Sequence, residues 1–124
     1  MVMKKKAERK ATDKVEKAGQ KGEVAGIRSK EDAQRVLRHV PDEKRFYCHD
    51  GRILNNLYEL RIALEQMDEN TYKHHVTEEK NDFARWVREV LLDDKLANDL
   101  TKCASSKDAA RVVAERITWL QART

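Results

Sequence analysis

The chain has 124 residues, the length of one small domain, and 40% of them are hydrophobic but only 6% aromatic. Its charge is unevenly divided: residues 1–30 hold ten basic and four acidic residues (+6), and the remaining 16 basic and 18 acidic residues give −2. There is no apolar run for a transmembrane helix, no secretory signal, no phosphate-binding glycine loop and no nucleophile motif. We therefore expect a cytoplasmic, non-catalytic protein with no membrane partner and two reduced cysteines.

The first 28 residues are predicted to form a flexible, disordered basic tail, and residues 29–124 a single helical domain. The tail has no aromatic residue and contains Gly19, Gly22 and Gly26, so it cannot bury enough apolar surface to offset its ordering entropy. Basic side chains of this kind bind polyanions weakly and without sequence preference, by releasing counterions from phosphates. The predicted polyanion contacts are Lys4, Lys5, Lys6, Arg9, Lys10 and Lys14.

Ordered structure is expected to begin with a helix capped by the Ser29 hydroxyl. Apolar residues recur at helical spacing from Ala33 to Val40, and Pro41 should end the helix because proline disfavours helical geometry in the residue before it. A β-hairpin should follow. Its short apolar arms, residues 46–48 and 52–54, flank an Asp-Gly pair, and glycine supplies the positive φ of a tight turn.

The remainder of the chain predicts five more helices, so the fold class is a mainly α domain of about six helices, some short, with one minor hairpin. The expected N-caps of these five helices, in chain order, are Asn56, Asp68, Thr77 or Asn81, Asp93, and Ser105 or Ser106. The expected inward-facing residues are Leu57, Leu60, Leu64, Met67, Phe83, Trp86, Val87, Val90, Leu91, Leu96, Ala97, Leu100, Cys103, Ala109 or Ala110, Val113, Ile117 and Leu120.

The first and the last of the six expected helices begin with related sequences, SKEDAQRVL at residues 29–37 and SSKDAARVV at residues 105–113. A structural repeat would need similarity over a longer span and in more copies. We interpret the pair as two independently capped amphipathic helices.

Several short blocks form a pattern between residues 33 and 100. They are FYCHDGRILNNLYEL at 46–60, His75-Val76, NDFARWVREVL at 81–91, and Leu96-Ala97. The pattern resembles a small family of domains of unknown function found mostly in archaea, with an Asp-Gly hairpin, Leu-x-Glu-Leu, His-Val and Asn-Asp-Phe-x-x-Trp as its marks. In that family a glycine often follows the Trp helix, where this chain has Leu92-Asp93-Asp94. The resemblance implies no activity, and it leaves out the basic tail and the last helix.

The donors for a metal ion are few and unfavourably spaced. Zinc sites usually use close ligand pairs such as C-x₂₋₄-C or H-x₃₋₅-H, and here the pairs Cys48-His49 and His74-His75 are adjacent, so that their side chains diverge. We therefore predict no metal, cofactor or catalytic residue, and structural roles for these side chains.

Four residues remain as candidates for recognition, each beside a structural interpretation. His75 is either a partly buried imidazole bonded to a carboxylate or a general base. Asn81 and Asp82 either cap a helix or form a polar site for an anion at its N-terminus. Trp119 departs from the apolar stripe of its helix, so it either faces a partner or closes the core.

Three functions from different classes are compatible with these features. The first is a protein-interaction module, an adaptor or regulatory domain, favoured by the size of the domain and the lack of catalytic motifs. The second is a nucleic-acid- or ribosome-associated protein anchored by the tail. The third is a metal-dependent sensor or enzyme that uses His75. The sequence leaves the oligomeric state open.

Overall fold

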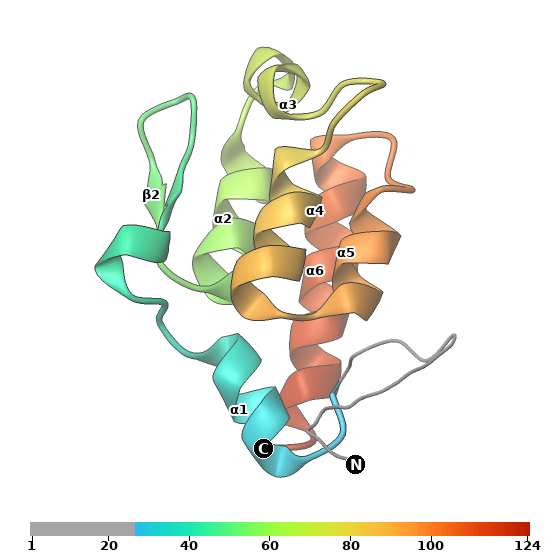
Figure 1. The fold of residues 1–124 in the computed structure, drawn as a ribbon. Helices are drawn as coiled ribbons and strands as arrows, with labels where there is room; N and C mark the ends of the chain where they lie inside the picture. Colours follow the sequence, from blue (N-terminus) through green and yellow to red (C-terminus); the bar gives the residue numbers. More distant parts are fainter. Residues whose placement is uncertain (1–26) are drawn as a thin grey trace.

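The longest helix, α6 (Ser106–Gln121), packs along α2 (Leu57–Gln66) and also contacts α1 (Lys30–Leu37) and α5 (Asp94–Leu100) (Figure 1). The computed structural model describes residues 27–124, which form a mainly helical fold with six α-helices and one two-stranded antiparallel sheet. The helices are α1 (Lys30–Leu37), α2 (Leu57–Gln66), α3 (Glu69–His75), α4 (Asp82–Trp86), α5 (Asp94–Leu100) and α6 (Ser106–Gln121), with a 3₁₀ turn η1 (Asp42–Lys44) and a π-helical turn η2 (Val87–Leu91). The predicted fold class is confirmed.

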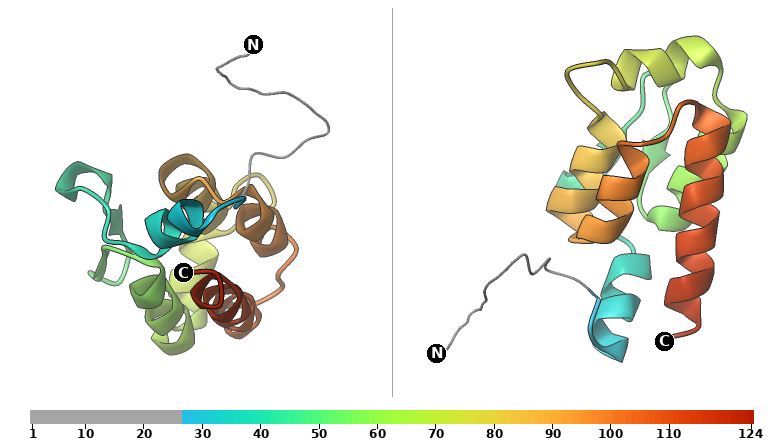
Figure 2. Two further views of the ribbon diagram at one scale, coloured as in Figure 1. Left: turned by 90° about the horizontal axis from the view of Figure 1, so that it is seen from below. Right: turned by 90° about the vertical axis from the view of Figure 1, so that its right-hand side faces the viewer.

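The helices form a bundle that has α3 at one end and α1 at the other. At one end α3 lies across the tops of α2, α4 and α6, and at the other end α1 packs beside the C-terminal part of α6 (Figures 1 and 2). The hairpin projects beside α2. Within residues 27–124, no helix combines the length and the apolar character needed to cross a lipid bilayer.

The apolar stripes read from the sequence face one shared core. The large side chains that are less than 2% exposed are Phe83, Leu57, Leu60, Leu64, Leu91, Leu96, Leu100, Leu120, Val36, Val87 and Val113. Burial of each such side chain contributes about 1.5–3 kcal/mol relative to its exposure. Of the predicted inward-facing residues, Val90 and Cys103 are only partly buried.

The first helix is shorter than its apolar spacing predicts. It ends at Leu37, and the Val40 N–H donates to the carbonyl of Asn55 beyond the hairpin, 2.8 Å away. Because Pro41 favours an extended residue before it, Val40 leaves the helix and joins the first helix to the hairpin. The prediction of a helix through Val40 was wrong by three residues.

Polar caps start the helices where the sequence places them. Asn56, Asp68 and Asp93 each accept a hydrogen bond from the backbone N–H three residues later. At the two open positions, the structure selects Asn81 for α4 and Ser105 for α6. Each such cap satisfies one of the N–H groups that a helix start leaves unpaired.

The related starts of α1 and α6 have the same cap. In α1, the Ser29 hydroxyl accepts from the Asp32 N–H, and the Asp32 carboxylate accepts from the Arg28 N–H. In α6, Ser105 accepts from the Asp108 N–H, and the Asp108 carboxylate accepts from the Ala104 N–H. Both helices begin with a variant of the capping box in which Asp replaces the usual Glu and accepts from the N–H of the residue before the cap. This shared local cap accounts for the related sequences.

The helix expected to start after Thr77 or Asn81 and to include Leu91 starts after Asn81 and changes its geometry halfway. After α4 ends at Trp86, η2 continues as a π-helix, and the Val87 carbonyl accepts from the Leu92 N–H. Leu92 then takes a left-handed conformation with φ 60°, which usually requires glycine.

The hairpin forms at the predicted place, with strands of only two residues each. Strand β1 (Phe46–Tyr47) pairs with β2 (Ile53–Leu54) in the register Phe46 to Leu54 and Tyr47 to Ile53. Gly51 has φ +97° in the turn, as the Asp-Gly pair predicts. Because neighbouring residues on a strand point to opposite faces, Phe46 and Leu54 are buried while Tyr47 and Ile53 are exposed.

Most of the predicted basic tail lies outside the described residues. That applies to all six predicted polyanion contacts: Lys4, Lys5, Lys6, Arg9, Lys10 and Lys14. Ile27, the first described residue, is partly buried against the core two residues before the Ser29 cap.

Candidate interaction surface

His75 connects the hairpin to the start of α4. It is 5% exposed, and its Nδ1 lies 3.0 Å from Oδ2 of Asp82. Its Nε2 lies 2.9 Å from the backbone nitrogen of His49 and accepts that N–H. A ring nitrogen that accepts carries no proton, so the network assigns the proton of His75 to Nδ1, which donates it to Asp82. Both nitrogens are thus engaged, which supports the structural interpretation of His75.

Asp82 and Asn81 complete this junction between α3 and α4. Burial opposes ionisation of the Asp82 carboxyl, but hydrogen bonds from His75 and Lys80 outweigh it and lower its pKa. Asn81 caps α4 through its side-chain oxygen and donates from Nδ2 to the carbonyl of Leu100, 3.2 Å away. The side-chain atoms proposed for recognition are therefore occupied by contacts within the chain.

His49, His74 and the two cysteines are stacked or at least partly buried. The rings of His49 and His74 stack with centroids 3.8 Å apart, and the pKa of His74 is lowered by desolvation and by His49. Burial raises the pKa of the Cys48 thiol, and burial with Asp108 raises that of Cys103 to about 11. Thiols with raised pKa values are weak nucleophiles. No group of three metal-binding side chains occurs among the described residues.

Trp119 lies at the end of the molecule away from His75, Asn81 and Asp82. It is partly buried against the core, and two guanidinium groups cover its ring, with Arg123 at 3.5 Å and Arg116 at 4.2 Å from the centroid. These cation–π contacts occupy its ring. The four recognition candidates thus divide into one cluster of three and one distant tryptophan.

A different surface carries four of the five large apolar side chains that are exposed in residues 27–124; the fifth, Leu92, lies elsewhere. Tyr47 is 63% exposed, Ile53 48%, Ile62 42% and Tyr58 37%. Tyr47 and Ile53 are paired on the outer face of the hairpin, and Tyr58 and Ile62 are neighbours one turn apart on α2. We call these four residues the hairpin–α2 surface.

A groove joins the two halves of the hairpin–α2 surface. It has a volume of about 290 Å³ and is lined by Ile53 and Leu54 from the hairpin, by Glu59 and Ile62 from α2, and by Arg52. Arg52 is fixed by bonds to Asp50 and Gln66, and Glu59 accepts from the Asn55 N–H. The groove is therefore apolar at its centre with a charged side chain of each sign at its edge.

The sequence contains a signal for this surface. On α2, Tyr58 and Ile62 lie outside the stripe formed by Leu57, Leu60 and Leu64. Once the hairpin is assigned, the alternation of its arms places one apolar residue of each strand outside. Apolar residues that the core does not need are candidates for an interface.

The comparisons with protein-family models, with curated proteins and with solved structures found no match to this chain. The resemblance noted in the sequence therefore stays a prediction.

Proposed function

We propose that this protein is a small interaction module that binds another protein through the hairpin–α2 surface. The observation that carries the proposal is that four large apolar side chains gather on two adjacent elements of a chain that is 39% charged. Apolar clusters with a polar rim mark binding sites more often than single exposed apolar residues do.

The shape of the groove suggests how a partner would bind. A groove of about 290 Å³ between Ile53 and Ile62 has room for an aromatic or branched side chain of the partner. Arg52 and Glu59 at its edge would then pair with polar groups around that side chain. A central apolar anchor with a polar rim is the usual arrangement of an interface hot spot.

The experiment is a pull-down from nuclease-treated native lysate with the full chain and two variants. Ile62→Glu keeps a good helix former, and Ile53→Thr keeps a β-branched residue in the strand. Each variant should reduce the affinity for the partner about tenfold, because an isoleucine contact of this size contributes about 1.4 kcal/mol.

The matched control is Leu92→Asn. Leu92 is 51% exposed, as much as Ile53, but it lies after η2 and outside the groove, and Asn tolerates its left-handed backbone. A stoichiometric protein that is retained by the control and lost with both variants would support the proposal. Retention by all variants, or self-association that explains the complex, would contradict it.

The second predicted function, nucleic-acid binding by the tail, rests on residues outside those described. It would be supported instead if material captured from untreated lysate disappeared after nuclease treatment and after deletion of residues 1–26.

A further inference from the structure

A pocket of about 230 Å³ with a basic lining lies between the start of α1 and the end of α6. It belongs to the end of the bundle where α1 packs beside the C-terminal part of α6 (Figures 1 and 2). Its lining holds three basic residues and no acidic one: Ile27, Arg28, Ser29, Lys30, Trp119 and Arg123. We call these six residues the Trp119 pocket. A concave surface that carries charge of one sign attracts ligands of the other sign.

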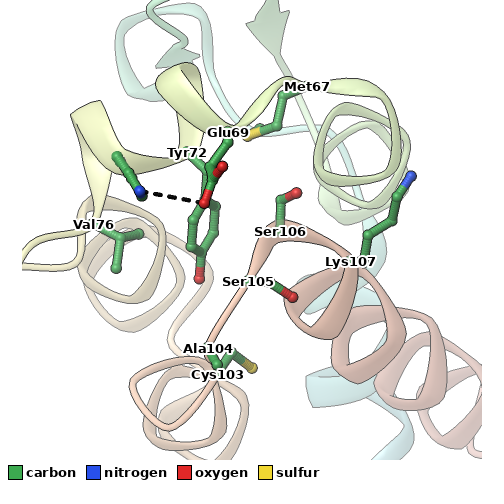
Figure 3. Close-up of a pocket in the computed structure, with 10 residues that line it drawn as sticks. Met67, Glu69, Tyr72, Val76, Cys103, Ala104, Ser105, Ser106 and Lys107 are labelled. Atoms are coloured by element: carbon green, nitrogen blue, oxygen red, sulfur yellow. Dashed lines mark ion pairs between the residues drawn. The ribbon is translucent and has the colours of Figure 1, made fainter.

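A pocket at the opposite end of the bundle has a different lining. It has a volume of about 440 Å³ and lies between α3 and the start of α6 (Figure 3). Glu69 lines it together with Lys73 and Lys107, and the Glu69 carboxylate is paired with Lys73 at 3.3 Å. The exclusively basic lining of the Trp119 pocket is therefore not a general property of this surface.

The charges of the described residues are divided along the bundle in the same way. Residues 65–80, at the α3 end, include five acidic and two basic residues. At the α1 end, residues 27–38 include four basic and two acidic residues, and residues 116–124 include two basic and no acidic residues. Because Asp93 neutralises Arg116, the net side-chain charge is −3 at the α3 end and +3 at the α1 end. Such a molecule approaches a polyanion with its α1 end first.

Arg123 is positioned to bind an anion. Its guanidinium lies 3.5 Å from the centroid of the Trp119 ring, and its Nη1 donates to the Trp119 carbonyl, 3.0 Å away. Arg116 covers the same ring at 4.2 Å, but its charge is neutralised by Asp93. No ion pair within residues 27–124 includes Arg123. The tryptophan thus orders a guanidinium whose other N–H groups are not engaged by a carboxylate.

Lys30 supplies a second positive charge from α1. It is the first residue of that helix, and it is exposed. Of the two acidic residues nearby, Asp32 is engaged by Arg35 and by the Arg28 N–H, and Glu31 does not line the pocket. Among the described residues, Lys30 has no ion-pair partner. Two basic side chains from different helices therefore line one pocket without neutralising carboxylates.

The lining favours a nucleic acid over a lipid surface. A membrane-binding face exposes large apolar side chains, and within residues 27–124 no exposed large apolar side chain lines this pocket. Its Ile27 and Trp119 are partly buried against the core. The fork of a guanidinium fits two oxygens of one phosphate. Residues 1–26, which precede Ile27, add eight basic and four acidic residues, which suits a polymer of phosphates better than a single small anion.

We propose that the α1 end of the bundle binds the phosphate backbone of a nucleic acid at the Trp119 pocket. Arg123, ordered by the Trp119 ring, donates to the oxygens of one phosphate, and Lys30 pairs with a neighbouring phosphate. These contacts read no bases, so binding is independent of sequence and weakens as salt is added. The Trp119 pocket shares no residue with the hairpin–α2 surface, and this function is separate from the one proposed there.

The first experiment locates the binding site in the unaltered full chain. The protein is labelled with ¹⁵N and titrated with oligouridylate of about 20 nucleotides at about 50 mM salt, where electrostatic binding is strong. Its two tryptophans give two indole N–H signals. The signal of Trp119 should shift, whereas that of Trp86, which is buried and bonded to the Lys44 carbonyl, should stay in place.

The second experiment measures the salt dependence of binding by the anisotropy of fluorescently labelled oligouridylate. In the full chain, Arg123→Gln and Lys30→Gln should each lower the affinity about fivefold at about 0.1 M salt, and each should reduce the slope of log K against log salt by about 0.7. Arg123→Lys keeps the charge and should restore the slope. The control is Lys102→Gln, which removes an exposed charge from the segment between α5 and α6; it should change both quantities much less.

Three results would overturn the proposal. The first is the absence of a Trp119 shift, whether or not the oligouridylate binds elsewhere on the chain. The second is an unchanged salt slope in both Arg123→Gln and Lys30→Gln. The third is binding to vesicles of phosphatidylserine and phosphatidylcholine that Arg123→Gln abolishes while the affinity for oligouridylate stays the same, because this would assign the pocket to a lipid surface. None of these results bears on the pull-down with the hairpin–α2 variants.

Discussion

Replacement of Arg116 by Met should destabilise the protein strongly, because it leaves a charge buried. The guanidinium of Arg116 forms two bonds with the Asp93 carboxylate, at 2.8 and 2.9 Å. The side chain of Asp93 is 0% exposed and that of Arg116 is 12% exposed. The same carboxylate caps α5 by accepting from the Leu96 N–H. Removal of one partner from a buried ion pair costs about 3–5 kcal/mol, and Met would keep an apolar contact with the Trp119 ring.

A second substitution separates the charge from the packing. Asp93→Asn keeps an oxygen that can cap α5, and it leaves Arg116 near the surface, so we expect a loss of about 1.5 kcal/mol. The double variant should lose only about 2 kcal/mol, less than Arg116→Met alone, because no unpaired carboxylate remains. The control is Arg111→Met on the same helix: its ion pairs with Asp108 and Glu115 are exposed, so its loss of stability should be much smaller.

The assay is urea-induced unfolding at 25 °C, followed by tryptophan fluorescence. For a domain of this size, a loss of about 3 kcal/mol corresponds to a fall in Tm of roughly 12–24 °C, which a thermal scan would show independently. If Arg116→Met lost no more than the Arg111→Met control, or if the effects of Arg116→Met and Asp93→Asn were additive, the reasoning from a buried ion pair would be refuted.

Three further predictions follow from single residues. His75→Phe should lower the free energy of unfolding by about 2 kcal/mol, because the His49 N–H and the Asp82 carboxylate lose their partner; urea unfolding indistinguishable from wild type would contradict this. Leu92→Gly should raise it by about 0.5 kcal/mol, because glycine relieves the left-handed strain at φ 60°; a decrease would be the contrary result. Burial raises the pKa of the Cys103 thiol from 9.0 to about 11. The stabilisation that comes from keeping this thiol protonated in the folded state is therefore complete below pH 9 and is lost as the pH rises through 11. Cys103→Ala should therefore flatten the decline of stability over that interval; an unchanged slope would argue against it.

The helices could be read from the sequence because their signals are local. Apolar residues recur with the helical period, and a cap such as Asp93 bonds to a backbone group only three residues away. The exceptions also have local causes. Val40 lies outside the first helix because Pro41 disfavours helical geometry in the residue before it. The π turn after Trp86 adds one residue to a helical turn, and the spacing of apolar residues does not reveal a change of that size.

The candidate sites depended on contacts between distant segments, which the sequence does not display. The sequence singled out His75, but its acceptor role depends on the His49 N–H, which lies 26 positions away. The Trp119 pocket forms only when the start of α1 is placed against the end of α6. Ile53 and Ile62 are unremarkable as single apolar residues, and their meaning as a surface comes from the packing of the hairpin beside α2.

Site-specific photo-cross-linking tests the interaction surface most directly. A photoreactive phenylalanine analogue would be placed at Ile62 in one protein and at Lys95, an exposed position on α5, in another. The account predicts that the chain captured in the pull-down cross-links at position 62, and that Ile53→Thr strongly reduces the yield of this product. Equal cross-linking at position 95, or none at position 62 while the partner is bound, would place the partner elsewhere and contradict the account.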